Sequence, residues 1–378
     1  MPLTIRPVRT AADLTKFIKM VWPIYKDDPA WVPPVIADRK KLLDRKRNPF
    51  YAHSEMEMFL AEENAQAVGR VAAIINRNHN QTHNDSVGFF GFFESIDSQP
   101  VADLLLSTAG KWLAERGMTA MRGPANPSMN DEVGLLVEGF DDPPQILMTY
   151  NPKYYIRLIE SFGLKNIKEL YAYRLVAEGF TTPKLERVNK LVREREKLVV
   201  RPVNFKNKAA FERDVATLRE IYNAAWVPTW GFVKMTNEEF DFLAADLKQI
   251  ANPDLTLIAE AAGRAVGFAL ALPDINQVLI NNRSGGMLGA AYQILFRKKD
   301  IKRARIIVLG VIPEFQRRGV DAALYYEVGT NAVKKHGLVE GEASWVLEDN
   351  VMMNRAAELM NGEIYKRYRI YEKTINKN

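Results

Sequence analysis

The chain has 378 residues, a net charge of +6 and a pI near 9.2. Hydrophobic residues make up 47% and charged residues 26%, a balance that is typical of folded globular proteins and excludes disordered and fibrous classes. The absence of cysteine excludes disulfides, thiolate metal sites and cysteine nucleophiles.

This length exceeds what one hydrophobic core usually organises, so we expect two domains. Residues 1–10 have no apolar signal core, and the longest apolar stretches are about half the roughly 20 residues of a bilayer span, so we expect a cytoplasmic protein. The positive charge suits nucleic acid, an acidic lipid surface or the phosphates of a cofactor. We interpret the densest basic cluster, 297–305, as a solvated face and expect no nucleic-acid partner.

An internal repeat sets the order of the predicted elements. Three segments recur in the same order, displaced by 195, 195 and 198 residues: TIRPV at 4–8 and VVRPV at 199–203, AWVPP at 30–34 and AWVPT at 225–229, and FLAEENAQAVGRVA at 59–72 and LIAEAAGRAVGFAL at 257–270. The last pair predicts a β-hairpin in each half. About 22 extra residues then follow in the second copy, after which Glu94 and Gly117 match Glu314 and Gly337 at a displacement of 220. We interpret the halves as two copies of one fold.

Each copy is predicted to run strand, one or two helices, hairpin, strand, long helix, strand, helix and a closing pair of strands. In the second copy these elements fall near 198–203, 207–225, 236–250, 255–272, 304–311, 319–336, 338–347, 350–361 and 362–374. The pattern indicates an α/β fold with mixed central sheets flanked by helices. We expect a first lobe over 1–180, a helical linker over 181–197 and a second lobe over 198–378.

The strongest chemical signal is IIVLGVIPEFQRRGVDAAL at 306–324. A β-branched run leads through Pro313 and a basic, glycine-containing turn into a helix. Free amides of a first helical turn, the helix dipole and a glycine together can hold a diphosphate, and Arg317 and Arg318 add positive charge.

This segment resembles motif A of the GNAT acyltransferase superfamily, whose pattern Q/R-x-x-G-x-G/A holds the pyrophosphate of acyl-coenzyme A. Gln316, Arg318 and Gly319 match it, whereas Asp321 stands where glycine or alanine is usual. The resemblance implies two tandem GNAT folds and acetyl-coenzyme A or a longer acyl-coenzyme A as donor. It also implies the cofactor-binding residues: Leu309 and Val311 for the pantetheine arm, and Gln316, Arg317, Arg318, Gly319, Val320, Asp321 and Ala322 for the pyrophosphate.

The stretch at 340–366 resembles motif B of the same superfamily, with Asn350 at a position that often faces the cofactor. The tyrosine that frequently protonates the departing thiolate is absent, because Ala357 and Glu358 occupy its neighbourhood. The first copy carries Ile96, Asp97 and Gln99 opposite Gln316, Arg317 and Gly319, so we expect its lobe to bind no acyl-coenzyme A.

Acyl transfer to an amine needs a base, and Glu340 and Glu342 are the catalytic candidates. With Ser344 they share one face of a predicted strand, where crowding of two acids raises the pKa of one. Glu342 is the first choice. The alternative is a solvated strand end on which the acids only keep the sheet soluble.

The first copy carries a long polar insertion at 123–155. Asn130, Glu132, Tyr150 and Asn151 are candidates to bind the acceptor, with Asp131 beside them. The alternative is an ordered packing loop.

His79 and His83 have helical spacing, but without a third ligand we expect a loop and no metal site. Trp31 and Trp226, matched in the repeat, are interpreted as core anchors.

The leading hypothesis is an N-acyltransferase in which an amine attacks acyl-coenzyme A directly and backbone amides near Leu309 to Val311 stabilise the intermediate. A sharper variant resembles GNAT-type bacterial ceramide synthases: a long-chain transferase acting on a lipid amine, with peripheral membrane contact through the apolar and basic segment GMLGAAYQILFRKK. The alternatives are a FemX-like aminoacyltransferase and a catalytically inactive ligand-binding module. The acceptor, the acyl length and the oligomeric state stay open.

Overall fold

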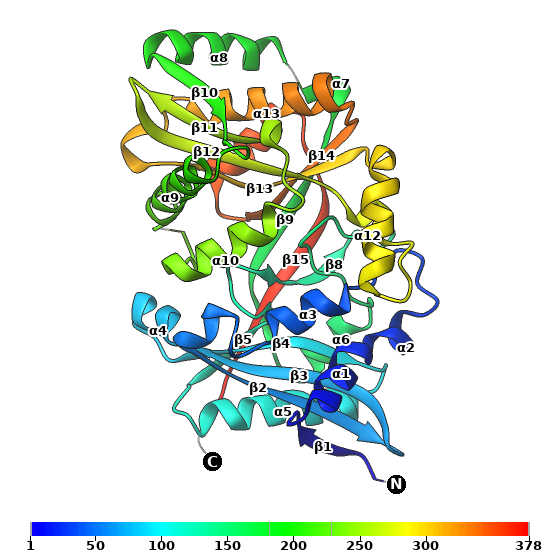
Figure 1. Ribbon diagram of the computed structural model, residues 1–378. Helices are drawn as coiled ribbons and strands as arrows, with labels where there is room; N and C mark the ends of the chain where they lie inside the picture. The colour runs from blue at the N-terminus through cyan, green and yellow to red at the C-terminus, as the bar shows by residue number, and fades with distance from the viewer. Residues whose placement is uncertain (1, 181, 228, 377–378) are drawn as a thin grey trace. The chain divides into compact units, whose positions relative to one another are not determined.

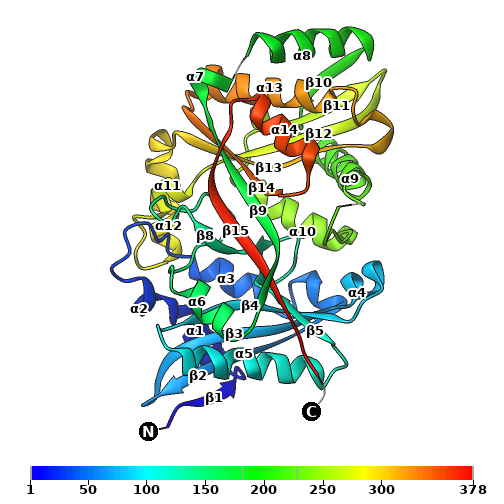
Figure 2. The same ribbon diagram turned by 180° about the vertical axis from the view of Figure 1, so that it is seen from behind.

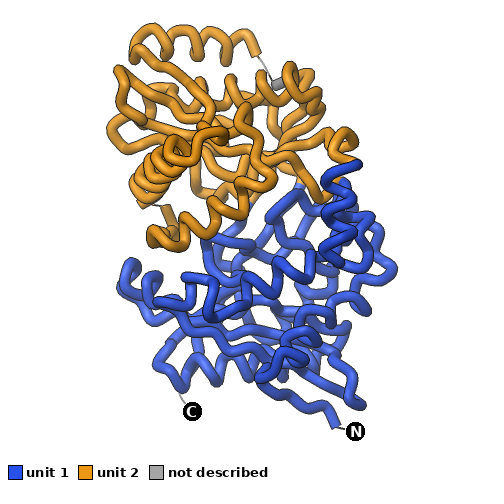
Figure 3. The backbone as a smooth tube through the Cα atoms, in the orientation of Figure 1, with its two compact units in different colours: residues 1–170, 278–296, 366–378 blue, residues 171–277, 297–365 orange. Residues whose placement is uncertain are grey.

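The computed structural model describes residues 2–180, 182–227 and 229–376, which divide into two compact units (Figure 3). Unit 1 comprises Met1–Leu170, Val278–Phe296 and Lys366–Asn378, and unit 2 comprises Tyr171–Gln277 and Arg297–Tyr365. The last strand of each copy therefore has residues in both units. The predicted lobes, 1–180 and 198–378, are placed from the order of the repeat along the chain. These lobe boundaries stay a prediction.

Unit 1 has a mixed sheet with the strand order β1-β2-β3-β4-β5-β15. Helix α5 lies on one face of the sheet, and α1 and α3 lie on the other (Figures 1 and 2). The strands are β1 (Thr4–Pro7), β2 (Ser54–Glu63), β3 (Gln66–Asn76), β4 (Val87–Ser95), β5 (Ala120–Gly123), β6 (Ala125–Asn126), β7 (Glu132–Val133), β8 (Leu135–Glu138), β9 (Lys165–Val176) and β15 (Glu363–Thr374). The helices are α1 (Ala11–Lys19), α2 (Val21–Tyr25), α3 (Ile36–Leu42), η1 (Pro49–Ala52), α4 (Arg77–His83), α5 (Gln99–Ala114), α6 (Tyr155–Ser161), α11 (Asn276–Leu279, which reaches into unit 2) and α12 (Met287–Phe296).

Unit 2 repeats this plan with the order β9-β14-β13-β12-β11-β10. Helix α13 covers one face of its sheet, with α8 packed against it, and α9 covers the other (Figures 1 and 2). Its further elements are α7 (Ala177–Phe180), α8 (Pro183–Arg195), β10 (Leu198–Pro202), α9 (Lys208–Ala225), α10 (Asn237–Leu247), η2 (Pro253–Leu255), β11 (Thr256–Ala261), β12 (Arg264–Pro273), η3 (Lys298–Asp300), β13 (Arg303–Val311), η4 (Pro313–Phe315), α13 (Val320–His336), β14 (Glu340–Leu347) and α14 (Val351–Leu359).

Both predicted hairpins are present, β2–β3 and β11–β12, and they share local geometry. The two central turn residues have positive φ in each hairpin, Asn64 and Ala65 in the first and Ala262 and Gly263 in the second. Such turns match the right-handed twist of the strands. The register also shifts after Ala61 in the first hairpin and after Ala259 in the second, at equivalent repeat positions. The common strand order and these shared irregularities support the inference of duplication.

Two local predictions were wrong. Each copy closes with a single 12-residue strand, β9 or β15, instead of a pair of strands. The histidine segment forms helix α4, because the side chain of Asn76 accepts a hydrogen bond from the His79 amide and caps a turn that the polar sequence does not reveal. His79 is buried against Phe89, and burial lowers its pKa to about 4.

Both tryptophans serve packing, as predicted. Trp31 is buried with its ring stacked on Tyr25, at 5.1 Å between centroids. Trp226 lies against Gly310 of β13, where an added Cβ would come within 2.2 Å of the indole. Within the described ranges every helix is too short or too polar to cross a bilayer.

Candidate active site

The parallel strands β13 and β14 separate as they approach the start of α13. Their register runs from Arg303 and Glu340 to Ile306 and Ala343. Just beyond, the pairing of β13 with its other neighbour, β12, shifts its register. The later halves of β13 and β14 therefore diverge. Leu309 and Val311 lie on this later half of β13 and are buried.

The turn from β13 into α13 has the predicted strand–turn–helix form. Arg317 and Gly319 both have positive φ, at 61° and 85°, and Val320 opens the helix with no described side chain capping it. Glycine is required at 319 for a second reason, because an added Cβ would lie 2.7 Å from Val192 of α8.

The side chains of this turn are largely engaged by the protein itself. Gln316 donates to the backbone oxygens of Val311 and Ala225, at 3.0 and 3.3 Å. Arg318 pairs with Glu196 at 3.2 Å and lies over the Phe315 ring, and Arg195 donates to the Arg318 carbonyl at 2.5 Å. Helix α8 and the residue after it thus cover one side of the turn. Arg317 is exposed.

Asp321 lies in the first turn of α13, where its carboxylate is close to free backbone amides. The backbone amides of Asp321 and Ala322 donate hydrogen bonds to it. Burial nevertheless raises the pKa of this carboxyl above its usual range, and the hydrogen bonds offset only part of that effect. The unusual residue in the motif is therefore partly desolvated at the helix N-terminus.

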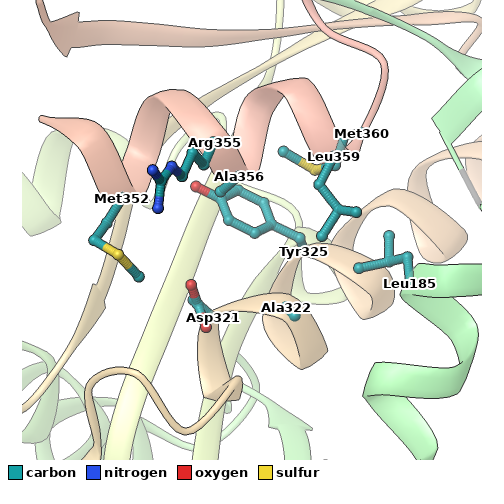
Figure 4. Close-up of a pocket in the computed structure, with 9 residues that line it drawn as sticks. All are labelled: Leu185, Asp321, Ala322, Tyr325, Met352, Arg355, Ala356, Leu359 and Met360. Carbon is teal, nitrogen blue, oxygen red and sulfur yellow. The ribbon is translucent and has the colours of Figure 1, made fainter.

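A pocket of about 170 Å³ opens beside Asp321 (Figure 4). Asp321 and Ala322 of α13 face Met352 and Arg355 of α14, with the Tyr325 ring between the two helices. Leu185 of α8 lies at the other end. The remaining lining residues are Ala356, Leu359 and Met360. The pocket thus has a polar end with both charges and an apolar end.

Sequence reasoning missed Arg355, Tyr325 and Leu185 as lining residues. A helical wheel places Asp321 and Tyr325 one turn apart, and Met352, Arg355 and Leu359 on one stripe. This periodicity identifies one face on each helix. It does not show that the two faces are in contact, because β14 lies between α13 and α14 in the chain.

Glu342, the first choice as base, is fully buried inside unit 2. Its carboxylate accepts hydrogen bonds from the Ser344 and Tyr365 hydroxyls, and Arg305 Nε lies 3.7 Å away. Arg305 also donates to Ser344 Oγ at 2.7 Å and to its carbonyl at 3.0 Å. Tyr365 is only half-buried, with the Arg174 guanidinium 4.4 Å from its ring centroid. Of these three contacts of Glu342, Tyr365 is the residue with the most exposure, since Ser344 and Arg305 are buried.

The other motif B candidates have structural partners. Glu340 lies 3.1 Å from Arg303 and 3.3 Å from Arg174, so it is engaged in an arginine cluster. The side chain of Asn350 accepts a hydrogen bond from the Met353 amide at 3.2 Å and caps α14. These contacts fix the start of the helix that lines the pocket.

The insertion of the first copy folds into small ladders, in which β6 pairs with β7 and β8 pairs with β15. Asn151 is buried and bonds the backbone of Leu136 through both ends of its amide, at 2.7 and 3.1 Å. Tyr150 donates to Asp28 at 2.9 Å. Glu132 pairs with Arg39 at 2.7 Å. Asn130, two residues before Glu132, is half-buried.

A second polar network missed by sequence reasoning centres on Glu94 of β4. The hydroxyls of Tyr155 and Tyr25 donate to this mostly buried carboxylate at 2.7 and 2.9 Å, and Arg70 lies 3.5 Å away. Burial raises the pKa of Glu94, although Arg70 and the two tyrosines act against that rise. Its aromatic partners come from α2 and α6, which the repeat pattern does not connect to β4.

Solved structures share this fold. A tandem GNAT protein from the clavulanic acid biosynthesis pathway superposes with a TM-score of 0.58 at 10% identity, covering 100% of both chains. A GCN5-related N-acetyltransferase from Sphaerobacter thermophilus gives a TM-score of 0.54 at 13% identity, covering 100% of this chain and 96% of the other. Together with the two units described above, these likenesses define a tandem GNAT N-acyltransferase fold.

Curated relatives are closer in sequence. The chain is 34% identical over 99% of its length to the bacterial ceramide synthase of Caulobacter vibrioides, of which it covers 98%. It is also 34% identical over 98% of its length to the protein YghO of Escherichia coli, of which it covers 95%. The chain belongs to the family of these two proteins. No family model matches it.

Proposed function

We propose that this protein is an acyl-coenzyme A-dependent N-acyltransferase that joins a long-chain acyl group to the amine of a lipid. The observation that carries the proposal is the 34% identity to a bacterial ceramide synthase across nearly the full length of both chains. Ceramides are amides of this kind. The GNAT fold and the turn before α13 support coenzyme A as the carrier of the acyl group.

The pocket of unit 2 fits the proposed donor. The amides at the start of α13, Arg317 and Arg355 are the groups to attract a diphosphate. Leu185, Leu359 and Met360 offer apolar surface to the pantetheine arm or the start of the acyl chain. Leu309 and Val311, on the part of β13 that diverges from β14, keep their proposed role of contacting the pantetheine arm. The negative charge of Asp321 opposes binding of the diphosphate.

The proposed chemistry forms a C–N bond and breaks the C–S bond of the thioester. The acceptor ammonium loses a proton through Tyr365 to Glu342, and the free amine attacks the carbonyl. The departing sulfur takes a proton from Tyr325, and the nitrogen of the tetrahedral intermediate returns its second proton to the Tyr325 oxygen as the amide forms. Burial raises the pKa of Tyr325 and keeps this phenol protonated before the reaction. Asn130 and Glu132 remain candidates to hold the acceptor, whereas the side chain of Asn151 is committed to the backbone of Leu136.

The function is tested by incubating the full chain with a long-chain amino alcohol such as sphinganine and either palmitoyl- or acetyl-coenzyme A. We expect free thiol and an N-acyl product by mass spectrometry, with the palmitoyl donor preferred. Product from acetyl-coenzyme A alone contradicts the long-chain assignment. No transfer, together with no heat on titration of either donor, favours an inactive module, and transfer from charged transfer RNA favours the FemX-like alternative.

The two charges in the pocket should shift coenzyme A affinity in opposite directions. Asp321→Asn removes an anion from the proposed diphosphate position and should tighten binding several-fold. Arg355→Glu should weaken it by roughly ten- to a hundredfold, the range of a lost charge-assisted contact. Calorimetry with coenzyme A measures both, and Arg213→Glu on the exposed face of α9 is the matched control.

Asp321→Asn has a second readout in stability. Because the folded-state pKa of Asp321 is raised, wild-type stability falls as pH rises from about 4 through that pKa. The variant should therefore melt higher than wild type at neutral pH and close to it at about pH 4. An equal difference at both pH values contradicts the raised pKa of Asp321. Coenzyme A binding unaffected by both pocket variants places the donor elsewhere.

A further inference from the structure

Helix α12, coloured yellow in Figure 1, has an unusual distribution of side chains. Five of its ten residues are large, apolar and exposed: Met287, Leu288, Tyr292, Leu295 and Phe296. Leu288 is 86% exposed and Leu295 73%. Among the described residues no other helix or strand has more than two exposed large apolar side chains. Such a patch marks an interaction surface.

Two small residues of α12, Gly289 and Ala290, face the protein. Ala290 is buried, and a Cβ on Gly289 would come 2.3 Å from the Asn282 side-chain oxygen. A surface helix ordinarily buries its large apolar residues and exposes small or polar ones. The reversed arrangement in α12 leaves Leu288, Tyr292 and Leu295, at i, i+4 and i+7, on one outward stripe.

The segment before α12 is anchored within unit 1 rather than loose. Trp22 Nε1 donates to the Arg283 carbonyl at 2.7 Å, and the Ile36 amide donates to the Gly285 carbonyl at 2.9 Å. Gly285 has a φ of 65°, and a Cβ there would lie 2.6 Å from both Trp22 and Pro34. Fixed attachment at this end means that the apolar stripe is presented without a further ordering cost.

The charge next to the stripe indicates its partner. Lys298 and Lys299 follow α12 closely and are exposed. Arg297 pairs with Asp300, and Arg283 donates to the carbonyls of Asp28 and Trp31. Interfacial membrane binding has two components. Apolar side chains enter the headgroup region, and basic residues beside them attract anionic headgroups. With ten residues the helix is about half the length of a span, so it lies on a bilayer and does not cross it.

We propose that α12 and the basic residues after it form a docking surface for an anionic phospholipid bilayer. This inference rests on the proposed function, since both a lipid amine and a long-chain amide reside in a membrane. Docking brings the enzyme to its acceptor without a transmembrane anchor. It also gives a purpose to the insertion that distinguishes the second copy from the first.

The test is co-sedimentation of the full chain with vesicles of phosphatidylcholine, with and without phosphatidylglycerol. We expect binding to the anionic vesicles. Leu288→Ser combined with Leu295→Ser should reduce partitioning by more than about tenfold. Lys298→Glu with Lys299→Glu should remove the preference for phosphatidylglycerol. Leu191→Ser on α8, where the leucine is 58% exposed, is the matched control and should bind as wild type.

Transferase activity on detergent-dispersed sphinganine separates this inference from the proposed function. The double serine variant should retain that activity while losing vesicle binding. Wild-type binding to vesicles without any transfer would refute the transferase and leave the docking surface intact. If the double serine variant binds vesicles normally, or if it changes only the oligomeric state in sedimentation velocity, the bilayer is not the partner.

Discussion

Replacing Tyr365 by phenylalanine should lower kcat by about a hundredfold and lower the melting temperature less than Glu342→Gln does. Glu342 is fully buried and hydrogen-bonded, so an acceptor reaches it only through a group that it already contacts. Tyr365 is that group, because its hydroxyl donates to Glu342 while the residue itself is half-buried. Loss of the Tyr365 hydroxyl removes the proposed proton path and keeps the carboxylate of Glu342.

The companion variant Glu342→Gln should lose kcat to a similar extent and should also lose stability. It leaves the buried guanidinium of Arg305 without its countercharge, whereas Tyr365→Phe does not. Steady-state rates with saturating donor and thermal melting separate the two effects. Full activity in Tyr365→Phe would remove both residues from the proton path.

Replacing Glu94 by alanine should cost unit 1 about 2–3 kcal/mol of unfolding free energy, the upper range for leaving mostly buried polar groups without a hydrogen-bond partner. The change removes the acceptor for the Tyr25 and Tyr155 hydroxyls and the countercharge of Arg70, which keeps only its bond to the Phe17 carbonyl. Urea unfolding followed by tryptophan fluorescence measures the loss. Glu63→Ala, at an exposed position of β2, is the control and should change stability little.

Glu94→Gln refines this prediction through pH. The amide oxygen still accepts from the two tyrosines, so the cost should be smaller than for alanine. Because the folded-state pKa of Glu94 is raised, wild-type stability should fall as pH rises from about 4.3 through that pKa, and the glutamine variant should lack this slope. A cost for alanine below about 1 kcal/mol contradicts the buried network as a source of stability.

The repeat shows how duplicated positions diverge. The predicted match of Glu94 with Glu314 is wrong, because Arg70 pairs with Glu94 across β3–β4 and its repeat equivalent Phe268 pairs with Gly310 across β12–β13. Gly310 of β13 is therefore the equivalent of Glu94. Glu94 accepts from two tyrosine hydroxyls in unit 1, whereas Gly310 leaves room for the Trp226 ring in unit 2. The glycine turn is likewise present only in the second copy, since Gln99 stands opposite Gly319. One copy has gained a buried polar core and the other a candidate anion site.

The amino-acid sequence by itself determined the local features of this protein. The two hairpins, the helix over 319–336 and the turn before it follow from apolar alternation, Pro313 and a glycine in the left-handed region. These features depend on residues within a few positions of one another. The motif that resembles GNAT proteins is one such local feature, and so it identified the fold.

The tertiary structure alone decided which side chains meet. Arg355 faces Asp321 across the pocket, Tyr365 reaches Glu342, and α8 covers the turn at Gly319. Each contact joins segments separated by a complete strand or helix. Periodicity fixes the face of an element on which a residue lies, but the partner of that face is set by packing of the whole unit.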